Sequence, residues 1–168
     1  MNWEEFLREG KLAEEKVRNG LLRRGFNAGE SIRTQFNTDE DIPIYDKSGQ
    51  KLFWISVKSN AKNILTLEQA RNFYKRGWMC GEVESKQWVY PPAIIIWVGL
   101  KFHWGAITPK RPSTEWYIFP AKHGLEIDER KTRLTGETHF IYPSYHVPGE
   151  CLRSKDDIIA YIQNLCGR

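Results

Sequence analysis

The stretch DIPIYDKSGQKLFWISVKSN, residues 41–60, contains two apolar runs separated by a short polar turn. An aspartate, Asp41, opens the first run, and the second run ends on a lysine, Lys58. Turn-forming residues between two runs of strand-forming residues predict a β-hairpin with strands over 41–45 and 51–58. In this hairpin Asp41 would lie roughly across from the end of the second strand that carries Lys58.

The segments on both sides of the hairpin carry helix and strand signals. Apolar residues at helical spacing over 6–22 predict a first helix, and we expect Gly10 to divide it into a short leader and a main helix. Weak alternation over 26–36 predicts a strand, and Thr66 with Gln69 predicts a capping box for a helix over 66–76. The apolar run at 93–100 predicts a buried strand. Later strands are expected at 104–108, 115–121 and 139–145, before a last helix capped by Ser154.

The order of these elements is a helix, three strands, a helix and a strand, followed by further strands and a terminal helix. This order predicts an α/β to α+β fold with a mixed central sheet flanked by helices. A chain of 168 residues is long enough for one domain with its own core. We expect a single domain, with a core over about residues 10–100 and a C-terminal elaboration over about 101–168.

Composition sets limits on function. The net charge is +4, which permits a polyanionic partner without requiring one. The three cysteines are widely spaced and contain no Cys-x-x-Cys pair, so neither a disulfide framework nor a zinc site is expected. No apolar run reaches the length of a membrane span, and reduced thiols fit the cytoplasm. We therefore expect a cytoplasmic protein with no membrane partner.

Two local patterns point to a polar site. Residues two apart in a strand share a face, so Trp54, Ser56 and Lys58 would point one way, opposite to Ile55. Glu14 lies on the same helical stripe as the apolar residues of the first helix. A glutamate on a buried stripe is costly unless it is paired or binds a cation.

Several motifs together resemble the PD-(D/E)xK nuclease superfamily, in particular archaeal Holliday-junction resolvases and restriction endonucleases. They are G-x-x-A-E-x-x-V at 10–17, LLRRGF at 21–26, Asp41, and Val-Lys-Ser at 57–59. The resemblance covers residues 10–76 and, more loosely, 93–100. It implies a restriction-endonuclease-like αβββαβ core and Mg²⁺- or Mn²⁺-dependent hydrolysis of phosphodiester bonds in DNA. It also implies a homodimer, since one such site cuts one strand.

The resemblance implies a role for each matching residue. Asp41 would be the principal metal-binding carboxylate, with Glu14 as an auxiliary acid that binds the metal directly or through water. Lys58 would position the attacking water and neutralise charge on the scissile phosphate. The backbone carbonyl of Val57 would complete the metal shell.

The sequence departs from the family pattern at two positions. Glu40 occupies the position of the family's proline, and Ser56 occupies the position of the motif acid. In one interpretation Glu68, on the following helix, supplies the missing carboxylate. In the other, the domain is a catalytically inactive module that binds nucleic acid or a protein partner.

Basic residues surround the predicted site and are candidates for contacts with phosphate groups. RNA is a less favoured substrate than DNA. The tryptophans are expected to pack in the sheet rather than to stack on bases. The predicted nucleic-acid-binding residues are Lys62, Arg71, Lys75 and Arg76.

Overall fold

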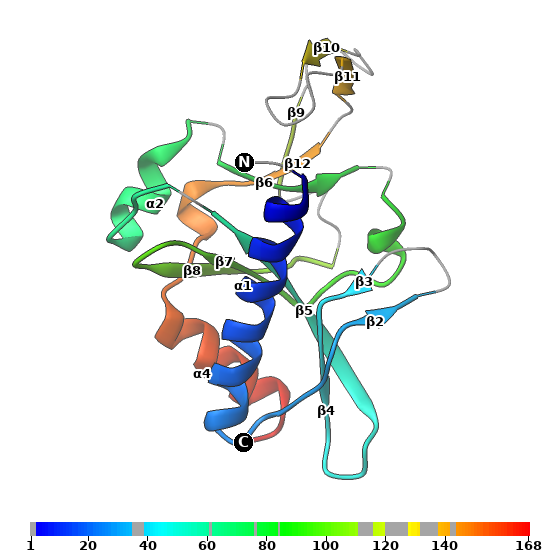
Figure 1. The fold of residues 1–168 in the computed structure, drawn as a ribbon. Helices are drawn as coiled ribbons and strands as arrows, with labels where there is room; N and C mark the ends of the chain where they lie inside the picture. Colours follow the sequence, from blue (N-terminus) through cyan, green and yellow to red (C-terminus); the bar gives the residue numbers. More distant parts are fainter. Residues whose placement is uncertain are drawn as a thin grey trace.

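The fold is known from a computed structural model of the chain. It describes residues 3–34, 39–60, 62–75, 77–83, 85–110, 116–119, 128–131, 138–141 and 144–168. Figure 1 shows a central sheet with helices α1 and α4 lying across one face of it. Among the described residues, no helix is both long enough and apolar enough to cross a bilayer.

The central sheet has five strands in the order β1-β4-β5-β7-β8. Neighbouring strands in this sheet are antiparallel, except for β5 and β7. These two run parallel because the chain between them crosses over through α2. This mixed sheet, with helices on both sides, confirms the predicted mixed class of helices and strands. The strands are β1 (Asn27–Ala28), β4 (Ile42–Tyr45), β5 (Lys51–Ser59), β7 (Ile94–Val98) and β8 (His103–Ile107).

The hairpin of β4 and β5 is fixed by its turn. The Asp46 carboxylate accepts hydrogen bonds from the backbone N–H groups of Ser48 and Gln50, at 2.8 and 2.9 Å. Gly49 adopts φ 88°, a conformation that favours glycine. The resulting register pairs Ile42 with Ile55, which places Asp41 toward the end of β5 that carries Lys58, as predicted.

One face of the sheet is covered by α1 (Trp3–Arg23) and α4 (Lys155–Leu165). The core on this face is built mainly from isoleucines of the sheet and apolar residues of the two helices. Ser154 caps α4 as predicted, since its hydroxyl accepts from the N–H of Asp157 at 3.2 Å. Residues of this core include Leu21, Ile42, Ile55, Ile94 and Ile158.

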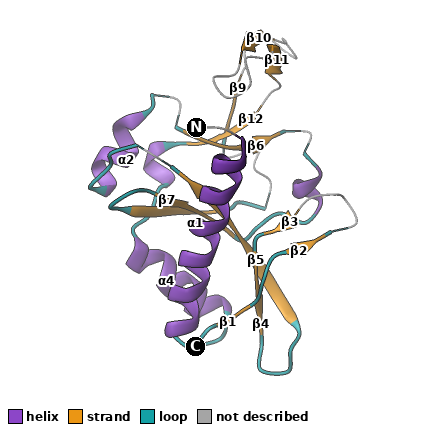
Figure 2. Cartoon of the chain, viewed as in Figure 1, coloured by secondary structure: helices purple, strands orange, loops and turns teal. Residues whose placement is uncertain are grey.

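The opposite face is covered by α2 (Leu67–Phe73) and by a three-stranded sheet. Figure 2 shows these strands as a separate orange layer above the central sheet. Tryptophans fill the space between the layers, so the expected packing role is confirmed for Trp78, Trp97, Trp104 and Trp116. The second sheet has the order β6-β12-β9, with β6 (Trp78–Glu82), β12 (Ser144–Val147) and β9 (Tyr117–Phe119).

Short elements complete the described chain. Two two-stranded ribbons were not expected from the sequence, and Figure 1 shows the second of them projecting from the body of the protein. The remaining elements are β2 (Ile32–Arg33) with β3 (Asp39–Glu40), β10 (Asp128–Lys131) with β11 (Thr138–Ile141), and the 3₁₀ turns η1 (Lys86–Val89) and η2 (Gly149–Cys151).

Three expectations about elements were wrong in detail. Helix α1 runs through Gly10 without a break, because a single glycine costs only about 1 kcal/mol in a helix that packs along β5. The predicted strand over 26–36 is interrupted after Ala28, where Gly29 lies against the Tyr45 ring. The expected strand over 139–145 corresponds to β11 and β12, which belong to different sheets, and residues 142 and 143 lie outside the described residues.

The end of α2 also differs from the expectation. The helix stops at Phe73 rather than at residue 76, because Tyr74 is extended and places its ring edge-on against Trp78, with centroids 4.7 Å apart. Its start is as predicted, since the Thr66 hydroxyl accepts from the N–H of Gln69 at 3.1 Å. The Gln69 side chain accepts from Leu65, one residue before the cap.

Candidate functional site

Asp41 lies at the bend between β3 and β4, one residue before the paired part of the hairpin. Its Oδ2 accepts a hydrogen bond of 2.8 Å from the backbone N–H of Val57 on β5. The side chain is half-buried, and burial raises the pKa of this carboxyl. The Val57 N–H and the charge of Lys58 partly oppose that rise.

Glu14 reaches the same place from α1, which packs on β5. The Glu14 and Asp41 carboxyl groups are in hydrogen-bonding contact. Burial, then the charge of Asp41 and that hydrogen bond, raise the pKa of Glu14 from 4.5 to about 7. Two carboxyl groups can share a hydrogen bond only if one of them keeps a proton. The shared hydrogen bond raises the pKa of Glu14 and lowers that of Asp41, so the proton belongs to Glu14.

Lys58 lies near this pair without being fixed to it. Its charge opposes the rise in the pKa of Asp41, so the two groups are within electrostatic range. Among the described residues, however, no carboxylate lies within 4.0 Å of the Lys58 ammonium group. The ion pair that meets this distance joins Lys51 to Glu40. An ammonium group near a carboxylate but not bound to it remains available to a third group, such as a phosphate.

Ser56, the neighbour of Lys58 on the same face of β5, is buried, with 6% of its surface exposed. Deeper on this side lies Cys80, whose pKa is raised to about 12, chiefly by burial and against the opposing charge of Lys58. Its thiol stays protonated at neutral pH and is no candidate nucleophile.

A groove of about 730 Å³ opens beside Lys58. Its walls come from α1, from the end of β5, from the segment after α2 and from β6 and β12. Polar and aromatic side chains share the lining. The residues that line it include Gly10, Lys58, Asn60, Tyr74, Lys75 and His146.

The other predicted site residues lie on α2, beside it, or outside the described residues. Glu68 is exposed in the first turn of α2. Arg71 donates to the carbonyl of Leu152 at 2.8 Å, which holds α2 against η2. Lys62 is exposed beyond β5, and Arg76 lies outside the described residues.

Two contributors were missed from the sequence. Asp39 is exposed, yet its charge raises the pKa of both Glu14 and Asp41. The acidic run at 39–41 is the signal that could have suggested it. His146 lines the groove from β12, and no local pattern connects it to residues so distant in sequence.

The oxygen atoms at this position suit a small hard cation. Mg²⁺ is usually held by one or two carboxylates and completes its shell with water and substrate oxygens. In an extended strand the N–H and C=O of one residue lie on the same edge, so the Val57 carbonyl faces the edge on which Asp41 lies. Among the described residues, no cluster of three or more His, Cys, Asp or Glu side chains is placed to hold a metal ion. The donor set is therefore Glu14, Asp41 and the Val57 carbonyl.

Comparison of the chain with protein-family models, with curated protein sequences and with solved structures gave no match.

Proposed function

We propose that the protein is a metal-dependent DNA endonuclease with a restriction-endonuclease-like core. The observation that supports this most strongly is the contact between Glu14 and Asp41. Two carboxyl groups from distant segments are brought together, half-buried, beside a lysine at the mouth of a groove. Such an arrangement costs folding free energy, and a bound cation would remove that cost.

The proposed chemistry is hydrolysis of a phosphodiester bond. A bound divalent cation would supply positive charge to the phosphate oxygens and increase the acidity of a bound water. Asp41 and Glu14 hold the cation, and the Val57 N–H fixes the orientation of the Asp41 carboxylate. Lys58 contributes a point charge and hydrogen-bond donors to the phosphate. Lys75 lines the same groove and would contact a neighbouring phosphate.

The sequence left open whether Glu68 supplies the carboxylate that is missing at Ser56 or whether the domain is inactive. We propose a site with two carboxylates, Glu14 and Asp41, assisted at longer range by the charge of Asp39. Ser56 supplies a hydroxyl in place of the motif acid. Cleavage of both DNA strands would require two copies of the chain, so we propose that the active form is a homodimer.

A second candidate function is a nucleic-acid-binding module without catalytic activity. It is favoured by one observation, the buried Ser56 hydroxyl at the position where the related nucleases carry an acid. A hydroxyl is a weaker ligand than a carboxylate for Mg²⁺. In this case Lys58 and Lys75 would bind phosphates, and no bond would be broken.

Cleavage assays distinguish the two functions. Purified protein is incubated with Mg²⁺ or Mn²⁺ and with supercoiled plasmid, single-stranded DNA, branched DNA or RNA. We expect metal-dependent cleavage of DNA that falls by at least about a hundredfold, ~2.7 kcal/mol, in Asp41→Asn and Lys58→Met. Glu68→Gln is the matched control and should retain activity.

Each outcome assigns a function. Loss of cleavage in Glu68→Gln would contradict the two-carboxylate site and favour the migrated acid. If no substrate is cut in either metal but DNA is retarded in a gel, and Lys58→Met weakens that retardation, the binding module is the function. If DNA is neither cut nor bound, both proposals are wrong.

A further inference from the structure

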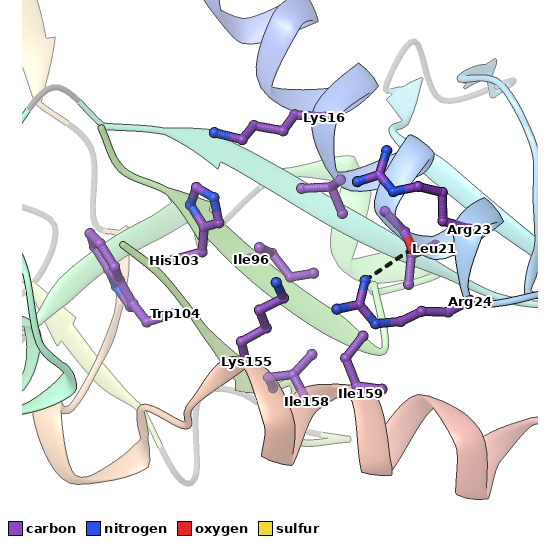
Figure 3. A pocket seen from close by; sticks show the side chains of 12 residues that line it. Lys16, Leu21, Arg23, Arg24, Ile96, His103, Trp104, Lys155, Ile158 and Ile159 are labelled. Atoms are coloured by element: carbon purple, nitrogen blue, oxygen red, sulfur yellow. Dashed lines mark hydrogen bonds between the residues drawn. The ribbon is translucent and has the colours of Figure 1, made fainter. Parts of the chain in front are cut away.

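A second cavity lies on the other face of the central sheet, between α1, α4 and the edge formed by β7 and β8. It has a volume of about 130 Å³. Figure 3 shows Ile96, Ile158 and Ile159 forming its floor, with Leu21 at one side. This volume is close to the roughly 150 Å³ of an engineered apolar cavity that binds benzene. The floor can therefore accept a small apolar group.

The mouth of this cavity carries an excess of positive charge. Lys16 and Arg23 reach it from α1, Arg24 from the turn that follows α1, and Lys155 from α4. Among the described residues that line the cavity, none is Asp or Glu. Within the described part of the chain, none of these four cations has a carboxylate within 4.0 Å. Arg24 donates a hydrogen bond of 3.0 Å to the carbonyl of Gly20.

His103 stands between the two lysines at this mouth. Figure 3 shows Lys16 and Lys155 extending toward it from opposite helices. Burial, then the charges of Lys16 and Lys155, lower the pKa of its imidazole. Its Nδ1 atom is buried, and a hydrogen bond with the Phe102 backbone opposes part of the fall in the pKa.

We propose that this cavity binds a small organic anion, a carboxylate or phosphate group carried on an apolar body of about the size of benzene. The anionic group would lie among Lys16, Lys155 and His103, and the apolar body would cover Ile96, Ile158 and Ile159. A nucleic-acid backbone presents its phosphates on polar sugars, which match the charge of the mouth but not the apolar floor.

This site is separate from the proposed nuclease centre. Ser56 and Lys58 point away from the α1 and α4 face of the sheet, toward the layer that contains Cys80. The proposal does not depend on nuclease activity, because Glu14, Asp41 and Lys58 do not line this cavity. Both sites nevertheless use α1, which carries Glu14 and Lys16 two residues apart.

The test is calorimetric titration of the full chain with phenyl phosphate and with benzoate. Benzyl alcohol tests the need for charge, and inorganic phosphate tests the need for an apolar body. We expect saturable binding of an aromatic anion below about 10 mM, and binding at least about tenfold weaker for both comparison compounds, ~1.4 kcal/mol. Lys155→Gln and Lys16→Gln should each weaken binding by about tenfold, ~1.4 kcal/mol. Lys101→Gln removes the same charge from an exposed position near β8 and is the matched control.

Four results would overturn the proposal. The first is the absence of saturable binding by either aromatic anion. The second is an equal loss of affinity in Lys101→Gln, which would show that net charge alone acts. The third is equal binding of inorganic phosphate, which would remove the role of the apolar floor. The fourth is displacement of phenyl phosphate by a short DNA duplex, which would show that the cations at the mouth bind the DNA phosphate backbone.

Discussion

Replacement of Glu14 by glutamine should stabilise the metal-free protein at neutral and alkaline pH. The rise in the pKa of Glu14 from 4.5 to about 7 corresponds to about 3 kcal/mol of penalty on its ionised form. The side chain is only half-buried, so solvent screening reduces this figure to about 1–2 kcal/mol. Glutamine has the same shape, can still donate a hydrogen bond to Asp41 and cannot ionise.

The sign of the pH dependence follows from proton binding. Between pH 4.5 and about 7 the folded protein holds a proton on Glu14 that the unfolded chain has lost. Stability of the wild type therefore falls as pH rises through this window. The Glu14→Gln variant lacks this transition, because its amide side chain does not titrate. The two proteins should have equal stability below pH 4.5 and should differ by the full amount above pH 7.

Urea unfolding in the presence of EDTA, at several pH values, measures this difference. Glu15→Gln is the matched control, since Glu15 is the exposed neighbour on the same helix. The reasoning fails if Glu14→Gln is no more stable than wild type above pH 7, or if Glu15→Gln gives the same gain. Addition of Mg²⁺ should reverse the order, because a cation held by both carboxylates stabilises the wild type more than the variant.

Three further predictions concern stability and are measured by urea unfolding. Gly10→Ala should stabilise by about 0.5–1 kcal/mol, because nothing lies within 4 Å of the added methyl group in the middle of α1. Gly77→Ala should destabilise strongly, because Gly77 has a φ of +79° and an added methyl group would collide with the Val147 carbonyl oxygen. A Gly77→Ala variant as stable as wild type would contradict this close packing of Gly77 against Val147. Lys51→Met should destabilise by about 1–3 kcal/mol, because it leaves the buried Glu40 carboxylate without its 2.6 Å partner, whereas the exposed Lys47→Met should have no effect.

Elements with a local cause could be predicted from the sequence. The turn at Asp46 and Gly49, the caps at Thr66 and Ser154, and the apolar run of β7 each depend on residues adjacent in the chain. Their errors lie at the ends of elements, as at Phe73, where α2 stops because Tyr74 is extended and its ring packs against Trp78 at the start of β6.

The site was predictable only in part. The register of the hairpin is a local property, so the proximity of Asp41 to Val57 follows from the sequence. Glu14 could be suspected because an acid on an apolar helical stripe needs a partner. The identity of that partner, and the raised pKa that it causes, depend on how α1 crosses β5.

The sequence by itself determined the order of the elements, the hairpin and the chemical types available to a site, because these depend on spacing along the chain. Tertiary structure alone decided which acid meets Asp41 and that four cations surround an apolar cavity between α1 and α4. The physical reason is that charge interactions and burial act through space. They are set by packing angles between elements, and side-chain periodicity does not specify those angles.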